Sequence, residues 1–120
     1  MRTTPAEKIR DYRARGWWGD TRIHDMFDAN ARANPDRLAI VDAPNRADLV
    51  GTPPQRLSFS VAAALVDGYA LSLARLGLGK DDVLVTQLPN IAEYPALYVA
   101  AMRLGIIVSP VPMQFRRHEL

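Results

Sequence analysis

The side chains of this sequence that are able to do acid–base, nucleophilic or metal chemistry are few and scattered. The two histidines, His24 and His118, lie far apart, and neither has a partner at a metal-ligand spacing. We expect His24 to lie on the surface of a helix. The chain has no cysteine, which excludes disulfides, thiolate metal sites and cysteine nucleophiles.

A serine nucleophile would need a histidine beside it and a strained turn beneath it. The candidate serines are Ser58, Ser60, Ser72 and Ser109. None stands in a nucleophile-elbow motif, and helix capping or packing explains each of them. These residues alone therefore predict no serine nucleophile in this chain.

Two short motifs near the middle of the chain are typical of turns. Gly77 and Gly79 follow a predicted helix and precede a predicted strand, whereas a phosphate-binding loop needs a strand first and a helix after it. Asp81 and Asp82 have the residue type of a magnesium pair, but we expect them to form a tight turn.

Gln87 and Asn90 are the polar residues whose position best suits ligand binding. They follow a predicted parallel strand at its carboxyl end, which is where open α/β sheets bind ligands. The alternative is structural: Asn90 shapes the turn and Gln87 packs at the end of the strand. The residues alone leave both interpretations open.

The composition excludes several classes of protein. Apolar residues make up 48% of the 120 residues, and the net charge is +2, from 15 basic and 13 acidic side chains. The charges are interspersed without a basic stripe, so we expect no nucleic-acid partner. No apolar run approaches the ~20 residues of a membrane span, and the N-terminus does not resemble a secretory signal. We expect a cytoplasmic protein.

The first 21 residues are expected to form an N-terminal arm, and residues 22–120 an α/β subdomain. A short helix in the arm should end at Gly16, and Trp17 and Trp18 should then anchor the arm against the main body. A second helix should run to about residue 33. The residues of this helix predicted to be buried are Ile23, Met26, Phe27 and Ala31. Those predicted to face solvent are His24, Asp28 and Arg32.

A β-hairpin and a long helix are expected next. Residues 38–42 and 56–59 have the pattern of strands that pair with each other, and residues 43–55 form the loop or hairpin tip between them. Ser60 is the predicted cap of a helix that ends before Gly77. Leu73 and Leu76 belong to the apolar face of that helix.

The remainder of the sequence predicts a βαβ unit with parallel strands over residues 83–88 and 106–111. Its helix should begin near Glu93, because a start at Asn90 would place Pro95 inside the helix. Residues 116–120 resemble the first turn of another helix. A parallel sheet needs cover on both faces, so this subdomain is expected to be incomplete and able to self-associate. The alternative is a free-standing interaction module.

Several stretches, taken in order, resemble the beginning of the acyl-adenylate-forming superfamily of acyl-CoA and aryl-acid ligases, most of all cyclohexanecarboxylate-CoA ligases. No single stretch is specific; their order and spacing over nearly the whole chain carry the resemblance. They are residues 16–21 (GWWGDT), 34–42 (NPDRLAIVD), 56–59 (RLSF), 73–77 (LARLG), 82–90 (DVLVTQLPN) with Glu93, 103–105 (RLG), 109–111 (SPV) and 116–120 (RRHEL).

The resemblance implies that residues 1–120 are an N-terminal fragment of an AMP-forming ligase. Such an enzyme activates a carboxylic acid with ATP and Mg²⁺ as an acyl-adenylate, and then transfers the acyl group to coenzyme A. The family's phosphate loop, nucleotide-binding motifs and catalytic lysine map onto no position of this sequence. The resemblance therefore assigns no catalytic residue, no cofactor-binding residue and no metal ligand to this chain. The fragment itself is expected to bind no cofactor and to be inactive, and a fragment of an aryl acid-AMP ligase is an alternative.

Overall fold

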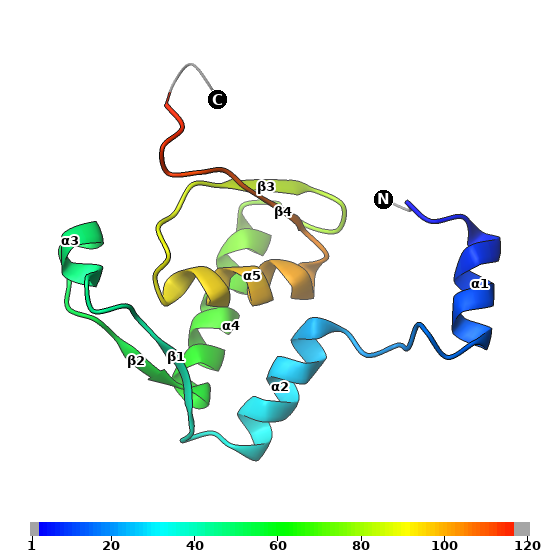
Figure 1. Ribbon diagram of the computed structural model, residues 1–120, viewed down its shortest axis with the longest axis horizontal. Helices are drawn as coiled ribbons and strands as arrows, with labels where there is room; N and C mark the ends of the chain where they lie inside the picture. The colour runs from blue at the N-terminus through cyan, green and yellow to red at the C-terminus, as the bar shows by residue number, and fades with distance from the viewer. Residues whose placement is uncertain (1–2, 117–120) are drawn as a thin grey trace.

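The computed structural model describes residues 3–116, and its helices and strands form the predicted α/β arrangement (Figure 1). Two small sheets are present in this part of the chain, an antiparallel pair β1–β2 and a parallel pair β3–β4. The elements are α1 (Ala6–Ala14), α2 (Ile23–Ala33), β1 (Leu38–Val41), α3 (Arg46–Val50), β2 (Arg56–Ser58), α4 (Phe59–Arg75), β3 (Val83–Thr86), α5 (Glu93–Leu104) and β4 (Ile107–Pro110).

The hairpin β1–β2 confirms the predicted pairing. Leu38 lies opposite Ser58 and Ile40 opposite Leu57, with a bulge between the two pairs. The connection between the strands is more ordered than the predicted loop, because the short helix α3 lies within it. Gly51, with φ of 74°, ends α3 in the left-handed region that favours glycine.

The βαβ unit also agrees with the prediction. β3 and β4 are parallel, with Val83 opposite Ile107, and α5 connects them. The helix begins at Glu93, so Pro95 falls in the first turn, where a missing N–H costs little. The side chain of Asn90 makes no capping hydrogen bond to α5.

The core of the body lies where α4 packs against α5. Alanines on α5 let the two helices approach closely, and Val66 and Leu73 of α4 fill the space between them. Leu76 was predicted to share this face, but it is 77% exposed, because it lies beyond the last residue of α4. The predicted cap was also wrong by two residues. The Oγ atom of Ser58, not of Ser60, accepts the hydrogen bond from the Val61 amide.

The face that α2 turns toward the body agrees with the predicted stripe only in part, since Phe27 packs against the core as predicted. Ile23 and Met26 are exposed, whereas His24 and Asp28, predicted to face solvent, are largely buried. The cause is an ion pair: Arg103 of α5 hydrogen-bonds to Asp28. This contact between helices outweighs the apolar periodicity of α2.

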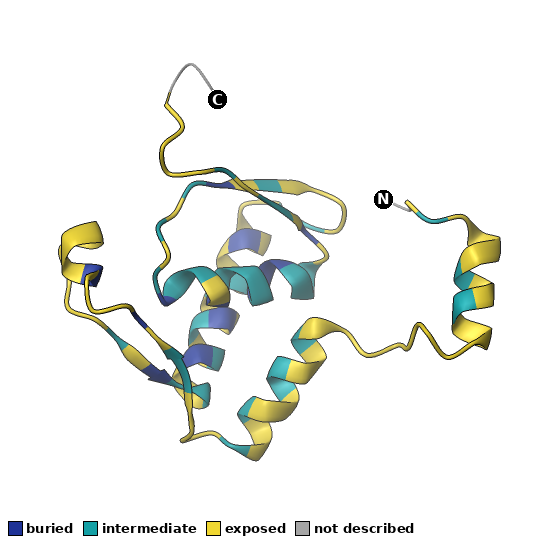
Figure 2. Cartoon of the chain, viewed as in Figure 1, coloured by how far each residue is buried: buried dark blue, intermediate teal, exposed yellow. Residues whose placement is uncertain are grey.

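Helix α1 of the arm does not pack against the body. Residues 15–22 separate α1 from α2 (Figure 1), and α1 contacts no other described helix or strand. Trp17 and Trp18 are 64% and 43% exposed, and both rings contact the ring of Tyr12 in the same arm, Trp17 tilted and Trp18 edge-on. The prediction that they anchor the arm to the main body was therefore wrong, and they pack locally instead. The ribbon that leads from α1 to α2 is mostly exposed (Figure 2).

One face of the β3–β4 pair is open to solvent. Val83, Val85 and Ile107 point away from the helices and are exposed, while Leu84 and Val108 pack on the core. Within residues 3–116, no helix combines the length and apolar character needed to cross a bilayer. The predicted helical turn at residues 116–120 falls almost entirely outside the described residues, as does His118.

Candidate functional site

The candidate site is the carboxyl edge of β3, together with the loop 87–92 and the first turn of α5. Gln87 has a structural partner there: its Nε2 donates hydrogen bonds of 2.9 Å to the carbonyl oxygens of Pro112 and Phe115. The side chain thus fixes the segment after β4 against the end of β3. Asn90 remains exposed at the tip of the loop.

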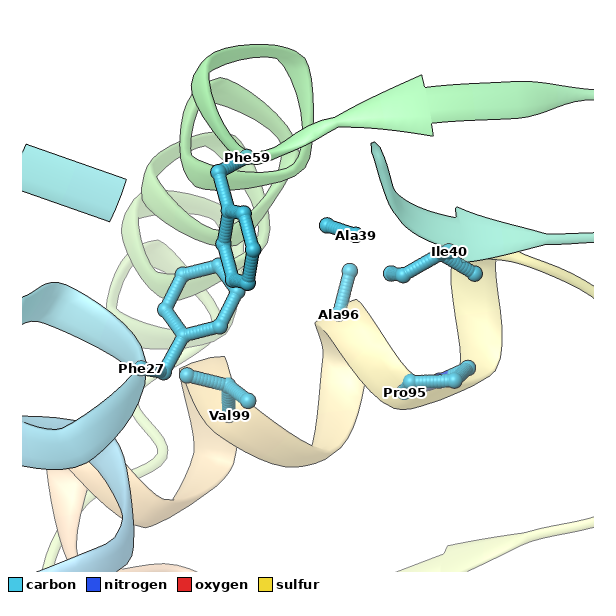
Figure 3. A pocket seen from close by; sticks show the side chains of 7 residues that line it. All are labelled: Phe27, Ala39, Ile40, Phe59, Pro95, Ala96 and Val99. Atoms are coloured by element: carbon cyan, nitrogen blue, oxygen red, sulfur yellow. The ribbon is translucent and has the colours of Figure 1, made fainter. Parts of the chain in front are cut away.

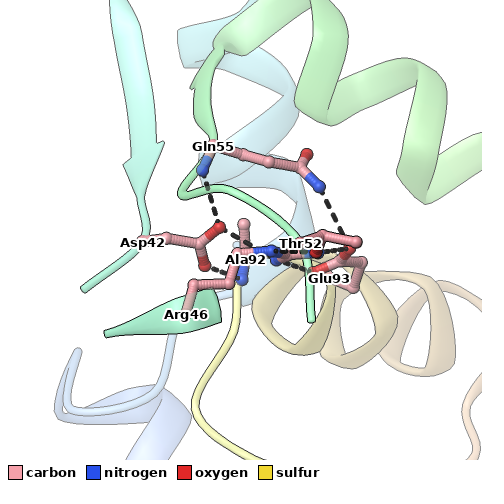
Figure 4. Close-up of polar contacts among 6 residues, drawn as sticks. All are labelled: Asp42, Arg46, Thr52, Gln55, Ala92 and Glu93. Carbon is pink, nitrogen blue, oxygen red and sulfur yellow. Dashed lines mark hydrogen bonds and ion pairs between the residues drawn. The ribbon is translucent and has the colours of Figure 1, made fainter. Parts of the chain in front are cut away.

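A buried ionic cluster, which we call the Arg46 cluster, lies beside this loop and consists of Asp42, Arg46, Thr52, Gln55 and Glu93 (Figure 4). The Arg46 guanidinium donates to both oxygens of Glu93, at 2.7 and 2.6 Å, and to Asp42 Oδ2 at 2.9 Å. Its Nε donates to Thr52 Oγ1 at 3.0 Å. The Arg46 side chain is only 5% exposed.

Asp42 connects the hairpin to α5 through its two carboxylate oxygens. Oδ2 accepts a hydrogen bond from the backbone N–H of Gln55 at 2.9 Å, and Oδ1 accepts one from the backbone N–H of Ala92 at 2.6 Å. Ala92 is the residue before the first residue of α5. Asp42 and Gln87 therefore hold the loop 87–92 at both of its ends.

The electrostatics of the cluster favour the charged form of each member. Hydrogen bonding to Glu93 raises the pKa of Arg46 against the opposing effect of burial, and Asp42 adds to the rise. Burial would raise the pKa of Asp42, but the amides of Gln55 and Ala92 together with Arg46 hold it below its usual value. Hydrogen bonding from Arg46 likewise lowers the pKa of Glu93.

Acid is expected to destabilise the chain through these two carboxylates. A carboxyl group whose pKa is lower in the folded than in the unfolded chain adds to the free energy of unfolding. That contribution is complete at a pH above the unfolded-state pKa of about 4, and it is lost as the pH falls through the folded-state pKa. The urea midpoint should therefore fall as the pH drops from about 5 to about 2. Glu93→Gln should make this fall shallower. A midpoint that stays constant over this range, or a Glu93→Gln profile parallel to the parent's, would contradict the assignment.

Three hydroxyl groups form a second polar cluster between β3 and α5. Thr86 Oγ1 lies 2.8 Å from the hydroxyl of Tyr94, which lies 3.4 Å from that of Tyr98. Hydrogen bonding to Tyr94, with burial, raises the pKa of Tyr98. These neutral hydroxyls satisfy one another at the buried end of the strand, so they hold β3 and α5 together.

The other candidate residues stay apart in the described part of the chain. Ser58 and Ser60 contact each other at the start of α4, and Ser72 Oγ donates to the Gly68 carbonyl. None of these hydroxyls, nor that of Ser109, hydrogen-bonds to His24. Over residues 3–116, no three His, Asp or Glu side chains form a group that could hold a metal.

Asp81 and Asp82 have the structural role predicted for them. Asp82 Oδ2 accepts from the Gly79 amide at 2.8 Å, which closes the turn before β3. Asp81 has φ of 73°, a conformation that belongs to tight turns.

The Arg46 cluster was missed by the sequence analysis. The pattern predicts Asp42 only as the end of a strand, places Arg46 only within the loop 43–55, and predicts Glu93 as the start of a helix. The available signal was weak: a carboxylate directly after a strand and another in the first turn of a helix. Because one guanidinium faces two carboxylates, the cluster carries a net negative charge and is suited to positioning a loop, not to binding an anion.

Known proteins resemble this chain in sequence along most of its length. Residues 27–120 match the model of the family described as AMP-binding enzyme. A salicyl-AMP ligase / salicyl-S-ArCP synthetase of Mycobacterium tuberculosis is 33% identical over 86% of this chain and 17% of that protein. A medium-chain fatty-acid–CoA ligase of Escherichia coli is 30% identical over 91% of this chain and 18% of that protein.

A solved structure resembles the chain in fold as well. The apo structure of MbtA from Mycobacterium smegmatis matches with a TM-score of 0.73 at 29% identity, over 97% of this chain and 20% of that chain. The chain thus spans less than a fifth of the length of the two curated relatives and about a fifth of this structure.

Proposed function

We propose, from the premise that this chain belongs to the AMP-binding enzyme family, that it forms the N-terminal part of an ATP-dependent ligase that joins a carboxylic acid to coenzyme A. The chain has the α/β fold of the N-terminal subdomain of adenylation-domain ligases. The observation that carries the proposal is the family match, which includes the Arg46 cluster, β3 and the loop before α5.

In this proposal the described residues position a loop and do not carry out the reaction. Arg46 is neutralised by Asp42 and Glu93, so it does not fit the phosphates of ATP. Among the described residues, the two carboxylates of the Arg46 cluster are engaged by Arg46. Binding of nucleotide, metal and coenzyme A is therefore assigned to other parts of the longer protein.

The proposal extends to which carboxylic acid the enzyme activates and which molecule accepts the acyl group. The paired tryptophans 17–18 and the stretch from Gln87 to Asn90 favour cyclohexanecarboxylate or a related short- or medium-chain acid, with coenzyme A as acceptor. The fatty-acid–CoA ligase among the relatives supports this choice. The salicyl-AMP ligase supports the second candidate, an aryl acid-AMP ligase.

Acid-dependent ATP–pyrophosphate exchange tests the proposal. Residues 1–120 alone should give no exchange above background, whereas a longer protein that contains them should exchange with cyclohexanecarboxylate. Salicylate or 2,3-dihydroxybenzoate as the preferred acid would favour the aryl acid-AMP ligase. Exchange by residues 1–120 alone would contradict the assignment of the chemistry elsewhere, and no exchange by the longer protein with any of these acids would contradict the proposed activity.

We further propose that isolated chains associate through the open face of β3–β4. Val83, Val85 and Ile107 form an apolar surface there, and a second copy of the chain would remove it from water. Light scattering at increasing concentration should show a rising mean mass, and Val85→Lys should reduce the rise. A monomer at high concentration would contradict this. A monomer that instead binds a different protein through this face would favour the interaction module.

A further inference from the structure

The aromatic side chains of the N-terminal arm form a cluster that is held by local contacts and remains open to solvent. We call it the arm cluster; it consists of Tyr12, Arg15, Trp17 and Trp18. The backbone N–H groups of Trp17 and Trp18 donate to the carbonyl oxygen of Tyr12, at 2.9 and 3.3 Å. The centres of the two tryptophan rings lie 5.6 and 5.4 Å from that of Tyr12. The Arg15 guanidinium lies over the Trp17 ring, 5.0 Å from its centre. The exposed aromatic surface is therefore pre-organised.

Helix α1 lacks the burial that normally stabilises a helix of its length. It has nine residues, none of which is buried, and within residues 3–116 it contacts no other helix or strand. Isolated helices shorter than about 12–15 residues are marginal in water, so helices in proteins depend on packing. The ion pairs of Arg13 with Asp20 and of Arg15 with Asp11 are exposed and contribute little. The described contacts therefore leave α1 without most of the stabilisation that it needs.

The apolar surfaces of the body do not cover the arm cluster in the described part of the chain. The open pocket between α2, β1, α4 and α5 is lined by residues of these elements, among them Phe27, Ile40 and Phe59, and by none of the arm (Figure 3). Val83 and Val85 on the open face of β3 are exposed as well. The partner of the arm cluster therefore lies outside the described body.

The arm belongs to the part of the chain that a longer relative shares. The match to the MbtA structure extends over 97% of this chain, so it includes the arm, and the matched part is 20% of the MbtA chain. The proposed function likewise places the arm at the start of a ligase of which residues 1–120 are the N-terminal part. The surface that α1 requires is then available in the rest of the same protein.

The size of the aromatic surface also favours a covalently attached partner over a second copy of the chain. Buried aromatic side chains contribute roughly 150–250 Å² each, and the three rings of the arm cluster already cover one another in part. A stable interface between separate proteins buries about 1,200–2,000 Å². A segment of the same chain needs less area, because it is held at a high effective concentration and loses little translational freedom on contact.

We infer that the arm cluster is an intramolecular docking surface for the part of the protein that follows residue 120. The inference rests on the proposed function, because it needs the longer protein. The partner is an apolar surface that receives the two indole rings, and Trp, Tyr and Arg are the residue types that dominate the energetics of protein interfaces. Docking covers Trp17 and Trp18 and stabilises α1, so it connects the beginning of the chain to its later part.

Hydrogen exchange of the unmodified proteins tests the inference. The backbone amides of α1 should exchange at least about tenfold more slowly in the longer protein than in residues 1–120 alone, while those of α5 stay protected in both. Equal rates for α1 would overturn the inference, and so would protection that appears in residues 1–120 as their concentration rises, because a second copy would then be the partner. The measurement needs no catalysis. Protection of α1 in a longer protein that shows no ATP–pyrophosphate exchange would therefore contradict the proposed function alone.

A double variant of the longer protein gives an independent readout. Trp17→Ala with Trp18→Ala should raise the exchange rates of the α1 amides at least about tenfold and leave those of α5 unchanged. The matched control is Lys8→Ala, at an exposed position on α1, which should leave both sets of rates unchanged. If the double variant also loses the protection of α5, Trp17→Ala alone takes its place with the same expectation. Protection of α1 that survives the loss of the indoles would overturn the inference.

Discussion

Arg46→Met is expected to lower the melting temperature of the chain by more than about 10 °C. The substitution keeps most of the apolar stem but removes the guanidinium from between Asp42 and Glu93. Asp42 has a fully buried side chain, so its charge would lose the compensation that Arg46 provides. Breaking a buried ion pair by removing one partner is costly for this reason. Thermal unfolding followed by circular dichroism measures the effect.

The matched control is Arg75→Met, which makes the same replacement at an exposed position near the end of α4 and should change the melting temperature by only a few degrees. Adding Glu93→Gln to Arg46→Met should recover part of the loss, because one of the two uncompensated charges is then removed. The cluster would be shown to be unimportant for stability if Arg46→Met melted within about 3 °C of the parent.

Leu73→Ala is expected to lower the free energy of unfolding by about 3 kcal/mol. Leu73 is buried in the core cluster between α4 and α5, so the shorter side chain leaves a cavity against Val66 and the alanines of α5. Because α5 approaches α4 through small residues, its backbone has little room to move into the gap. Urea unfolding, with the slope checked for two-state behaviour, gives this value.

Leu76→Ala removes the same atoms three residues later and should change the free energy of unfolding by no more than about 0.5 kcal/mol. Leu76 is exposed beyond the end of α4, although the helical periodicity alone would place it beside Leu73. Equal losses in the two variants would mean that α4 continues past Arg75 and that Leu76 is buried.

The parts of the fold that sequence could predict are those set by local signals. The βαβ unit was predicted from apolar runs on either side of an amphipathic segment, and Gly105 marks the end of its helix with φ of 74°. Pro95 correctly moved the start of α5 to Glu93. In each case the deciding interaction lies within a few residues, so the pattern is visible along the chain.

The parts that could not be predicted depend on contacts between distant residues. The inward face of α2 includes Asp28, which Arg103 binds from far along the chain, so only part of the predicted apolar stripe is buried. Trp17 and Trp18 looked like an anchor because large aromatic side chains are usually buried, yet Tyr12 offers them a local surface. Gln87 was correctly placed at the end of β3, but its partners after β4 were not foreseeable.

The Arg46 cluster closes two loops of very different length. Asp42 meets Gln55 across 13 residues, and Arg46 meets Glu93 across 47 residues. Loop-closure entropy grows only logarithmically, so the longer loop costs roughly 1 kcal/mol more than the shorter one. For that small entropic difference, Arg46 and Asp42 join the hairpin to the start of α5. The two side chains therefore act as a noncovalent crosslink between the two halves of the body.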